Sequence, residues 1–228
     1  MCSPVILSNF VEKYDLEKYF NEDMKPFLEL LLFNRGDHIC KDGEKMDYLF
    51  FFIEGKAKVY TVLKNGKSLL LCFYNSVKII GDVEFMNSEA ATSNIQVIED
   101  SYCIAIPMEK VREHLINDAK FLLFMCKSLG QKLNRLSKNS SINLLYPLEN
   151  RLASYILATG ITVENSGIEV LVFNENLTEI SELLGTSYRH LLRTLKMLCE
   201  NGIIKKKESS FEVVDKQKLI NLSADLYK

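Results

Sequence analysis

The pattern of hydrophobic residues changes at Pro107, and this change divides the chain into a strand-rich part and a helical part. From about Leu28 to Pro107, short apolar and β-branched runs alternate with turn residues, as expected for antiparallel strands. Strands at this spacing predict a small antiparallel barrel or jelly roll. The predicted strands are Tyr48–Ile53, Lys58–Leu63, Ser68–Tyr74, Val77–Ile80, Ile95–Ile98 and Cys103–Ile106.

Glycine marks each predicted turn of this part. The turns are Arg35-Gly36-Asp37, Lys41-Asp42-Gly43, Glu54-Gly55-Lys56 and Lys64-Asn65-Gly66-Lys67. Asn65 and Gly66 lie between two apolar runs, and both residue types tolerate the positive φ of a type I′ turn. These two residues therefore predict a tight hairpin.

A long helix is predicted from about residue 118 to residue 143, where the chain has no proline and apolar residues follow helical spacing. Its narrow apolar stripe and its polar far side, with Lys127, Lys132 and Lys138, favour pairing with a second copy. The alternative is packing on its own barrel. The predicted dimer seam is Leu122, Met125, Leu129, Leu133 and Leu136. Cys126 lies close to this seam, so oxidation could lock the dimer; the alternative is a small core residue.

A further helix is predicted from Leu148 to Ala158. Pro147 suits the first position of a helix, and Thr159-Gly160 can end one. A hairpin-like stretch from Gly167 to Phe173 follows it.

Two short helices around Gly185 form the most specific pattern of the chain. Thr178 can cap the first helix, and Thr186-Ser187 can cap a second that runs to about Asn201. Glycine suits the turn between them because it accepts left-handed backbone angles. Helical spacing on the second helix predicts a buried face and an exposed basic face. The buried face is Leu191, Leu195 and Leu198, and the basic face is Arg189, Arg193 and Lys196.

This arrangement predicts a helix-turn-helix whose second helix enters a DNA major groove. An arginine there can donate two hydrogen bonds to guanine. After the helix, Ile203-Ile204 and Phe211–Val214 indicate two strands around a lysine-rich tip, a wing suited to phosphate contacts. The predicted DNA-binding residues are Thr186, Ser187, Tyr188, Arg189, His190, Arg193, Lys196, Lys205 and Lys206.

The net charge of −2 is unevenly distributed. Residues 1–116 carry 13 Lys and Arg against 18 Asp and Glu, whereas residues 117–228 carry 15 against 12. A basic part on an acidic body suits a polyanionic partner. The first residues lack a signal-peptide pattern, and no apolar run is long enough for a membrane span. We therefore expect a cytoplasmic protein that binds no membrane.

The six cysteines and three histidines are scattered along the chain, so no metal site, catalytic site or cofactor is predicted. Cysteines of a cytoplasmic protein are mostly reduced core residues. A cupin-like enzyme would need clustered ligands, and of the histidines only His38 lies among the predicted strands. A module that docks on proteins without specific DNA binding is the other alternative to a DNA-binding regulator.

The chain resembles the Crp/Fnr family of bacterial transcription regulators over nearly its whole length, and in particular its YeiL-like branch. The segments that carry the resemblance are Tyr146-Pro-Leu-Glu-Asn-Arg-Leu-Ala153 and Thr186-Ser-Tyr-Arg-His-Leu-Leu-Arg193. The resemblance implies an α+β fold with an N-terminal β-roll (jelly roll, cyclic-nucleotide-binding-like), a long dimerisation helix and a C-terminal winged helix-turn-helix. It also implies a homodimer that reads a palindromic operator in double-stranded DNA, with RNA polymerase as a further partner that the family allows.

The resemblance gives two residues of the second helix a role. Arg193 matches the guanine-reading arginine of the family, and Ser187 matches its phosphate-contacting serine. Arg189 replaces the usual recognition glutamate, so the common half-site of the family is not expected here.

The sensor region departs further from the family. In cyclic-AMP-binding relatives, a Gly-Glu motif and a later Arg-Ser pair hold the ribose and phosphate, and a Thr-Ser pair on the long helix meets adenine. This chain has Gly81-Asp82, Ala91-Thr92 and Leu136-Ser137 there. A buried cyclic phosphate would lack its bidentate charge partner without the arginine. We therefore expect an unidentified effector other than cyclic AMP. The tentative effector pocket is Gly81, Asp82, Thr92, Leu136 and Ser137.

The cysteine cluster of the family's iron–sulfur branch is also absent from the sequence. A cluster gathered only in three dimensions, for instance from Cys2 and Cys103, is the alternative.

The sequence thus predicts three segments: an effector-sensing β-roll at 1–116, a dimerisation helix at 117–145 and a winged-helix DNA-binding domain at 146–228. The predicted function is a homodimeric, sequence-specific transcription regulator, not an enzyme, in which the β-roll responds to an unidentified signal.

Overall fold

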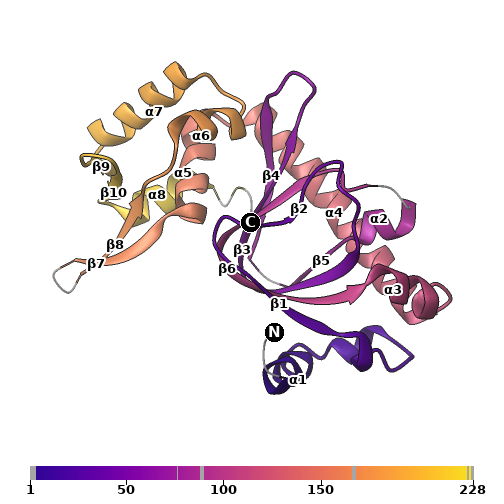
Figure 1. Cartoon of the computed structure of the whole chain (residues 1–228). Coiled ribbons are helices and arrows are strands. Elements are labelled where there is room, and N and C mark those ends of the chain that lie inside the picture. The colour runs from indigo at the N-terminus through magenta and orange to yellow at the C-terminus, as the bar shows by residue number, and fades with distance from the viewer. Residues whose placement is uncertain (1–3, 76, 88–89, 166–167, 225, 227–228) are drawn as a thin grey trace. The chain divides into compact units, whose positions relative to one another are not determined.

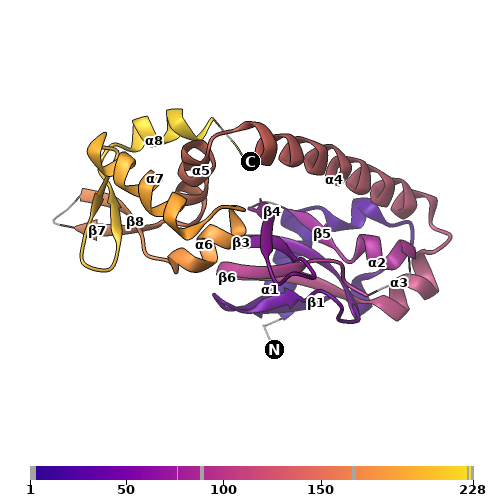
Figure 2. The ribbon, with the colours of Figure 1, turned by 90° about the horizontal axis from the view of Figure 1, so that it is seen from above.

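The computed structural model describes residues 4–75, 77–87, 90–165, 168–224 and 226 of the chain. Its contacts divide the chain into two compact units. The first contains residues 1–61 and 73–136, and the second contains residues 62–72 and 137–228. Figures 1 and 2 show the elements of both units. Because the division falls inside the long helix, it does not isolate residues 117–145 as a third part.

An antiparallel sheet curls into a roll in the first unit (Figure 1). Strand β6 (Asn94–Pro107) pairs with β1 (Glu29–Phe33), β2 (His38–Cys40) and β3 (Tyr48–Val62). Strand β3 also pairs with β5 (Lys78–Ile80) and neighbours β4 (Ser68–Tyr74). The predicted antiparallel, strand-rich part is confirmed, and β1 and β2 add two strands to it.

Gly55, predicted to lie in a turn, is instead part of the continuous strand β3. The pairing of β3 with β6 shifts register between Phe52 and Ala57, so this segment is a bulge. Gly55 has a φ of 107°, and a Cβ at this position would lie 2.1 Å from the Ser101 Oγ atom. Glycine at a bulge permits this close approach of two backbones. The tripeptide therefore bends the strand without ending it, and the predicted turn is wrong.

Asn65 and Gly66 form the predicted hairpin between β3 and β4. The Leu63 N–H group donates to the Lys67 carbonyl at 2.8 Å, which closes the turn. The Gly66 N–H group donates to the Leu63 carbonyl at 2.8 Å, so Lys64 and Asn65 are the central residues of the turn. A positive φ, 79°, occurs at Gly66 and not at Asn65. The hairpin is confirmed, but its turn is not of type I′, because that type needs positive φ at both positions.

Helices close the roll of the first unit at its ends and side. These are α1 (Pro4–Lys13), α2 (Asp82–Asn87) and α3 (Met108–Leu115), with 3₁₀ turns η1 (Leu16–Tyr19) and η2 (Lys25–Phe27). Figures 1 and 2 both place α2 beside the long helix α4 (Ala119–Leu145). Phe51 of the sheet and Phe121 of α4 are fully buried in this unit. None of the three helices was predicted, because each is short, with 10 residues or fewer.

The second unit combines a four-stranded antiparallel sheet with helices. The sheet order is β7 (Ile161–Asn165), β8 (Ile168–Phe173), β10 (Phe211–Val213) and β9 (Ile204–Lys206). The helices are α5 (Leu148–Thr159), α6 (Leu177–Leu183), α7 (Tyr188–Glu200) and α8 (Lys216–Ser223). The predicted helix after Pro147 and the helix pair around Gly185 are confirmed, whereas β7 and α8 were not predicted. Gly167, the predicted start of the hairpin, lies outside the described residues.

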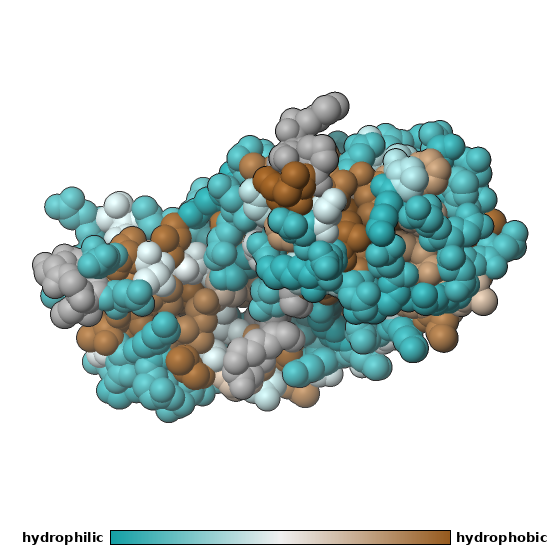
Figure 3. Space-filling view, turned by 90° about the horizontal axis from the view of Figure 1, so that it is seen from below, coloured by the Kyte–Doolittle hydropathy of each residue, from teal (hydrophilic) through white to brown (hydrophobic). Residues whose placement is uncertain are grey.

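Strand β7 forms the edge of this sheet and carries exposed apolar side chains. Ile161 is 45 % exposed and Val163 is 40 % exposed. In Figure 3, hydrophobic residues show at the surface beside the grey segment at the far left. Among the described residues, none of the helices has the length and hydropathy needed to cross a lipid bilayer.

Candidate nucleic-acid interface and β-roll interior

The turn between α6 and α7 is fixed by two side-chain caps and one glycine. The Asn176 Oδ1 atom accepts a hydrogen bond from the Thr178 N–H group at 2.9 Å, so Asn176 and not Thr178 caps α6. Ser187 caps α7, as predicted, by accepting from the His190 N–H group at 3.2 Å. Gly185 lies between them with a φ of 60°. The polypeptide therefore turns from one helix into the next with both helix starts hydrogen-bonded.

Helix α7 has the two faces that its sequence predicts. Leu191, Leu195 and Leu198 are buried, whereas Arg189, Arg193 and Lys196 are exposed. Lys196 lies 3.6 Å from Glu200 on the next turn. Neither Arg189 nor Arg193 forms an ion pair with any residue that the structure describes. The two guanidinium groups are therefore available to a ligand.

The exposed face of α7 also carries apolar surface that the sequence analysis did not identify in full. Tyr188 is 48 % exposed, and Leu192 is 41 % exposed. Leu192 was overlooked because it stands next to Leu191 in a leucine-rich helix. Its position, one residue out of step with the core leucines, is the signal that could have placed it outside.

Two residues of α5 donate hydrogen bonds to the helix-turn-helix segment, one at the turn and one just before α6. The Arg151 Nη1 atom donates to the Leu184 carbonyl at 2.5 Å, directly before Gly185. The buried Tyr155 hydroxyl donates to Glu175 at 2.7 Å, and burial raises the pKa of this phenol. Arg151 thus links α5 to the residue directly before Gly185.

Strands β9 and β10 form the predicted wing. Lys205 and Lys206 are exposed, but they belong to β9 and not to the tip. The tip closes through a hydrogen bond from the Lys207 N–H group to the Ser210 carbonyl at 2.8 Å. Lys207 also lies 3.3 Å from Glu212. Lys205 and Lys206 thus present positive charge on the strand itself.

Helix α4 is rotated relative to the orientation that the sequence analysis assigned to it. Met125, predicted on the dimer seam, is fully buried, and Leu122 and Leu129 are half-buried. Leu133 is 69 % exposed and Leu136 is 45 % exposed. Apolar residues of α4 lie both on the face that packs on the first unit and on the exposed face. The periodicity of the sequence does not distinguish the two faces. Among the exposed residues of α4, one stripe at heptad spacing is Leu123, Cys126, Gly130, Leu133, Ser137, Ser140 and Leu144.

Of the tentative effector residues, only Gly81 and Asp82 are buried; Thr92, Leu136 and Ser137 are exposed. The Asp82 carboxylate pairs with the Lys132 ammonium and accepts a hydrogen bond from the Ser128 hydroxyl at 3.3 Å. Lys132 was predicted on the polar far side of the helix, and this is wrong. Its ammonium reaches into the first unit because a buried carboxylate needs a partner of opposite charge.

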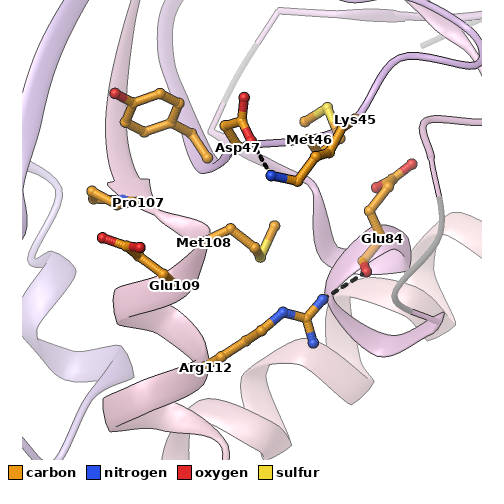
Figure 4. A pocket seen from close by; sticks show the side chains of 9 residues that line it. Lys45, Met46, Asp47, Glu84, Pro107, Met108, Glu109 and Arg112 are labelled. Atoms are coloured by element: carbon orange, nitrogen blue, oxygen red, sulfur yellow. Dashed lines mark hydrogen bonds and ion pairs between the residues drawn. The ribbon is translucent and has the colours of Figure 1, made fainter.

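A cavity of about 530 Å³ lies at one end of the roll, between α2 and α3 (Figure 4). The Arg112 Nη2 atom donates to the Glu84 carbonyl at 3.2 Å, and Lys45 pairs with Asp47 at 2.8 Å. None of the five tentative effector residues lines it. Its charged groups of both signs include Glu84, which lies two positions from Asp82 on α2.

The cysteines do not form a metal site within the described part of the chain, where no group of three or more potential ligands occurs. Burial, with a contribution from Glu84, raises the pKa of the Cys40 thiol to about 12. Burial also raises the pKa of Cys103. Both thiols therefore stay protonated at neutral pH. Cys2 lies outside the described residues.

Two protein-family models match the chain. Residues 30–118 match the cyclic nucleotide-binding domain, and residues 150–222 match the Crp-like helix-turn-helix domain. The regulatory protein YeiL of Escherichia coli O157:H7 is 30 % identical over 207 residues, which cover 91 % of this chain and 91 % of that protein.

Solved structures show the same fold. A putative Crp/Fnr-family regulator from Eubacterium rectale has a TM-score of 0.73 at 15 % identity, covering 95 % of this chain and 100 % of its own. A Crp/Fnr-family regulator from Thermus thermophilus has a TM-score of 0.68 at 19 % identity, covering 86 % of this chain and 99 % of its own.

Proposed function

The chain belongs to the Crp/Fnr family of transcription regulators, and from this premise we propose that it binds a palindromic operator as a homodimer through the exposed face of α7. Family and fold indicate a regulator rather than an enzyme. The observation that carries the proposal is the exposed pair Arg189 and Arg193, which form no ion pair with a described residue and lie on a helix whose opposite face is buried.

Each exposed group of α7 suits a different part of DNA. Arg193 can donate two hydrogen bonds to the O6 and N7 atoms of guanine. Leu192 offers apolar surface for the methyl group of thymine, which only the major groove displays. Ser187 at the helix start and the wing lysines Lys205 and Lys206 suit phosphate oxygens, which position the protein without reading sequence.

Binding to DNA selected by the wild-type protein from a random-sequence pool tests this assignment. Arg193→Ala should weaken binding to the selected duplex by about 1–3 kcal/mol and relax the preference at one base pair. Lys205→Ala should weaken binding to all duplexes alike and lower the salt dependence of affinity.

Lys45→Ala is the matched control, because it removes one exposed positive charge from the β-roll. It should leave the affinity for the selected duplex unchanged. If Arg193→Ala bound that duplex as tightly as the control variant, Arg193 would not be a base-reading residue.

The outer face of α4 supports the homodimer. One row of its exposed residues recurs at alternating steps of three and four from Leu123 to Leu144, which is the heptad spacing of paired helices. Gly130 has no atom within 4 Å of the place where a Cβ would lie, so a second helix can approach closely there. Cys126 is exposed on the same stripe.

Mild oxidation of the purified protein tests this seam. A disulfide needs Cα atoms about 4.4–6.8 Å apart, so Cys126 should cross-link to its copy if the stripe is the seam. The expected product is a dimer on a non-reducing gel that Cys126→Ser abolishes. A Leu133→Lys variant that remained fully dimeric in solution would contradict the assignment of the seam.

A further inference from the structure

A buried ion pair connects α2 to the long helix inside the first unit. The Asp82 side chain is 1 % exposed and that of Lys132 is 19 % exposed. The Ser128 hydroxyl donates to the same carboxylate at 3.3 Å, one helical turn before Lys132. Asp82 and Lys132 are 50 positions apart in the chain, so this contact exists only in the folded protein.

Each charge of the pair needs the other to offset its loss of hydration in the interior. A buried carboxylate or ammonium is costly unless an opposite charge and hydrogen bonds compensate it. An anion that entered this region would have to separate Lys132 from Asp82 and leave the carboxylate unpaired. The interior therefore resists anions as long as Asp82 is present.

The neighbouring groups add to this resistance. Burial raises the pKa of Glu84, and the negative charge of Asp82 raises it further. The positive charge of Lys132 opposes this shift of the Glu84 pKa, while its ammonium pairs with Asp82. The other cation next to α2, Arg112, donates to the Glu84 carbonyl at 3.2 Å and lies over the Phe85 ring. Lys132 is therefore the cation that Asp82 neutralises.

We propose that Asp82 and Lys132 determine the effector selectivity of the β-roll at α4: Asp82 occupies the anion site on Lys132 and so excludes phosphate- and carboxylate-bearing effectors from it. The pair also holds α4 on the roll without any small molecule. The regulator then binds its operator without an added anionic effector, a consequence that rests on the proposed function.

Replacing the internal anion by an external one tests the proposal. Asp82→Ala removes the carboxylate and leaves room beside Lys132 for acetate. The variant should unfold about 5–10 °C below the wild type and bind the operator about tenfold more weakly. Acetate, compared with chloride at equal ionic strength, should raise the unfolding midpoint of the variant in a saturable way and restore operator binding. The wild type should not respond to acetate.

Two variants control for unspecific effects of acetate. Asp82→Ala combined with Lys132→Met lacks the ammonium and should lose the acetate response. Glu99→Ala breaks the exposed Lys56–Glu99 pair, which has a distance of 2.8 Å, and should show no acetate response. Equal acetate responses in all variants, or none in Asp82→Ala, would overturn the proposal.

The wild-type protein provides a measurement that does not depend on the folding of any variant. Cyclic AMP, cyclic GMP and inorganic phosphate should leave its unfolding midpoint unchanged, and a saturable rise with any of them would overturn the proposal. These midpoints need no DNA. A wild type that bound no DNA would therefore refute the proposed function alone, while the midpoints still decide the role of the ion pair.

Discussion

The exposed face of α7 and the ion pair inside the β-roll are both made of charged side chains, but they differ in the distance along the chain between their residues. Arg189 and Arg193 lie four positions apart on one helix. Asp82 and Lys132 lie 50 positions apart on two elements. Helical spacing alone determines the geometry of the first site. The second depends on how the whole unit packs, and only the structure reveals it.

The same contrast separates two glycines with positive φ. Gly185 is required by the local turn between α6 and α7, where the nearest atom to an added Cβ would lie at 3.6 Å, an ordinary contact distance. Gly55 is required by the approach of Ser101 from another strand, whose Oγ atom would lie at 2.1 Å and whose Cα atom at 2.6 Å. A side chain at Gly55 therefore meets backbone that cannot move aside easily.

Replacing each glycine by alanine should give the largest difference between the two regions. Gly55→Ala combines backbone strain with overpacking and should cost about 3 kcal/mol or more of unfolding free energy. Gly185→Ala brings only the strain of the left-handed conformation, about 1–2 kcal/mol. Urea unfolding followed by circular dichroism measures both. Equal losses would show that the contact of β3 with Ser101 adds nothing to the local strain.

The features that could be predicted from the sequence are those that depend on neighbouring residues. The strand-rich part, the long helix and the helix-turn-helix were identified because each shows a periodicity over neighbouring residues. At the helix-turn-helix, the turn residue Gly185, the cap Ser187 and the leucine face of α7 were all predicted from local spacing. Leu192 is the exception, because its neighbours in a leucine-rich segment conceal its exposure.

Features that depend on distant residues were missed. Glu54-Gly55-Lys56 has the composition of a turn, and only the presence of Ser101 on β6 makes it a bulge. Lysine is a residue type that usually lies in solvent, and Lys132 is largely buried only because it pairs with the buried Asp82. The predicted seam through Met125 failed for a related reason: a helix with two apolar faces gives a periodic pattern that does not reveal which face is covered.

Helix caps extend the comparison to smaller effects. Asp118 caps α4 by accepting from the Lys120 and Phe121 N–H groups at 2.9 and 3.2 Å. It also accepts from the N–H group of Asn21, 97 positions away, at 2.6 Å. Burial opposes the charged form of Asp118, but these hydrogen bonds outweigh it and hold the pKa of the carboxyl below its ordinary value of 3.8. This cap is thus partly local and partly distant.

Asp118→Ala should lower the unfolding free energy by about 2–3 kcal/mol at pH 7, since it removes a charged acceptor from several N–H groups. Because the pKa is lowered in the folded state, this contribution is complete above about pH 4 and disappears as the pH falls through the folded-state pKa. Urea unfolding of both proteins between pH 7 and pH 3 measures the difference. A gap between wild type and variant that widened on acidification would contradict the assignment.

Ser187→Ala should have the smallest effect, about 1 kcal/mol, because Ser187 caps α7 through one uncharged hydrogen bond to His190. Hydrogen exchange tests whether the two caps differ in which amides they protect as well as in how much they stabilise the protein. Ser187→Ala should speed exchange only at the first amides of α7, and Ser187→Thr, which keeps the hydroxyl, should not. Asp118→Ala should speed exchange at the start of α4 and also at Asn21. If Ser187→Ala deprotected amides far from α7, the recognition helix would depend on distant contacts after all, and the contrast with the β-roll interior would be one of degree.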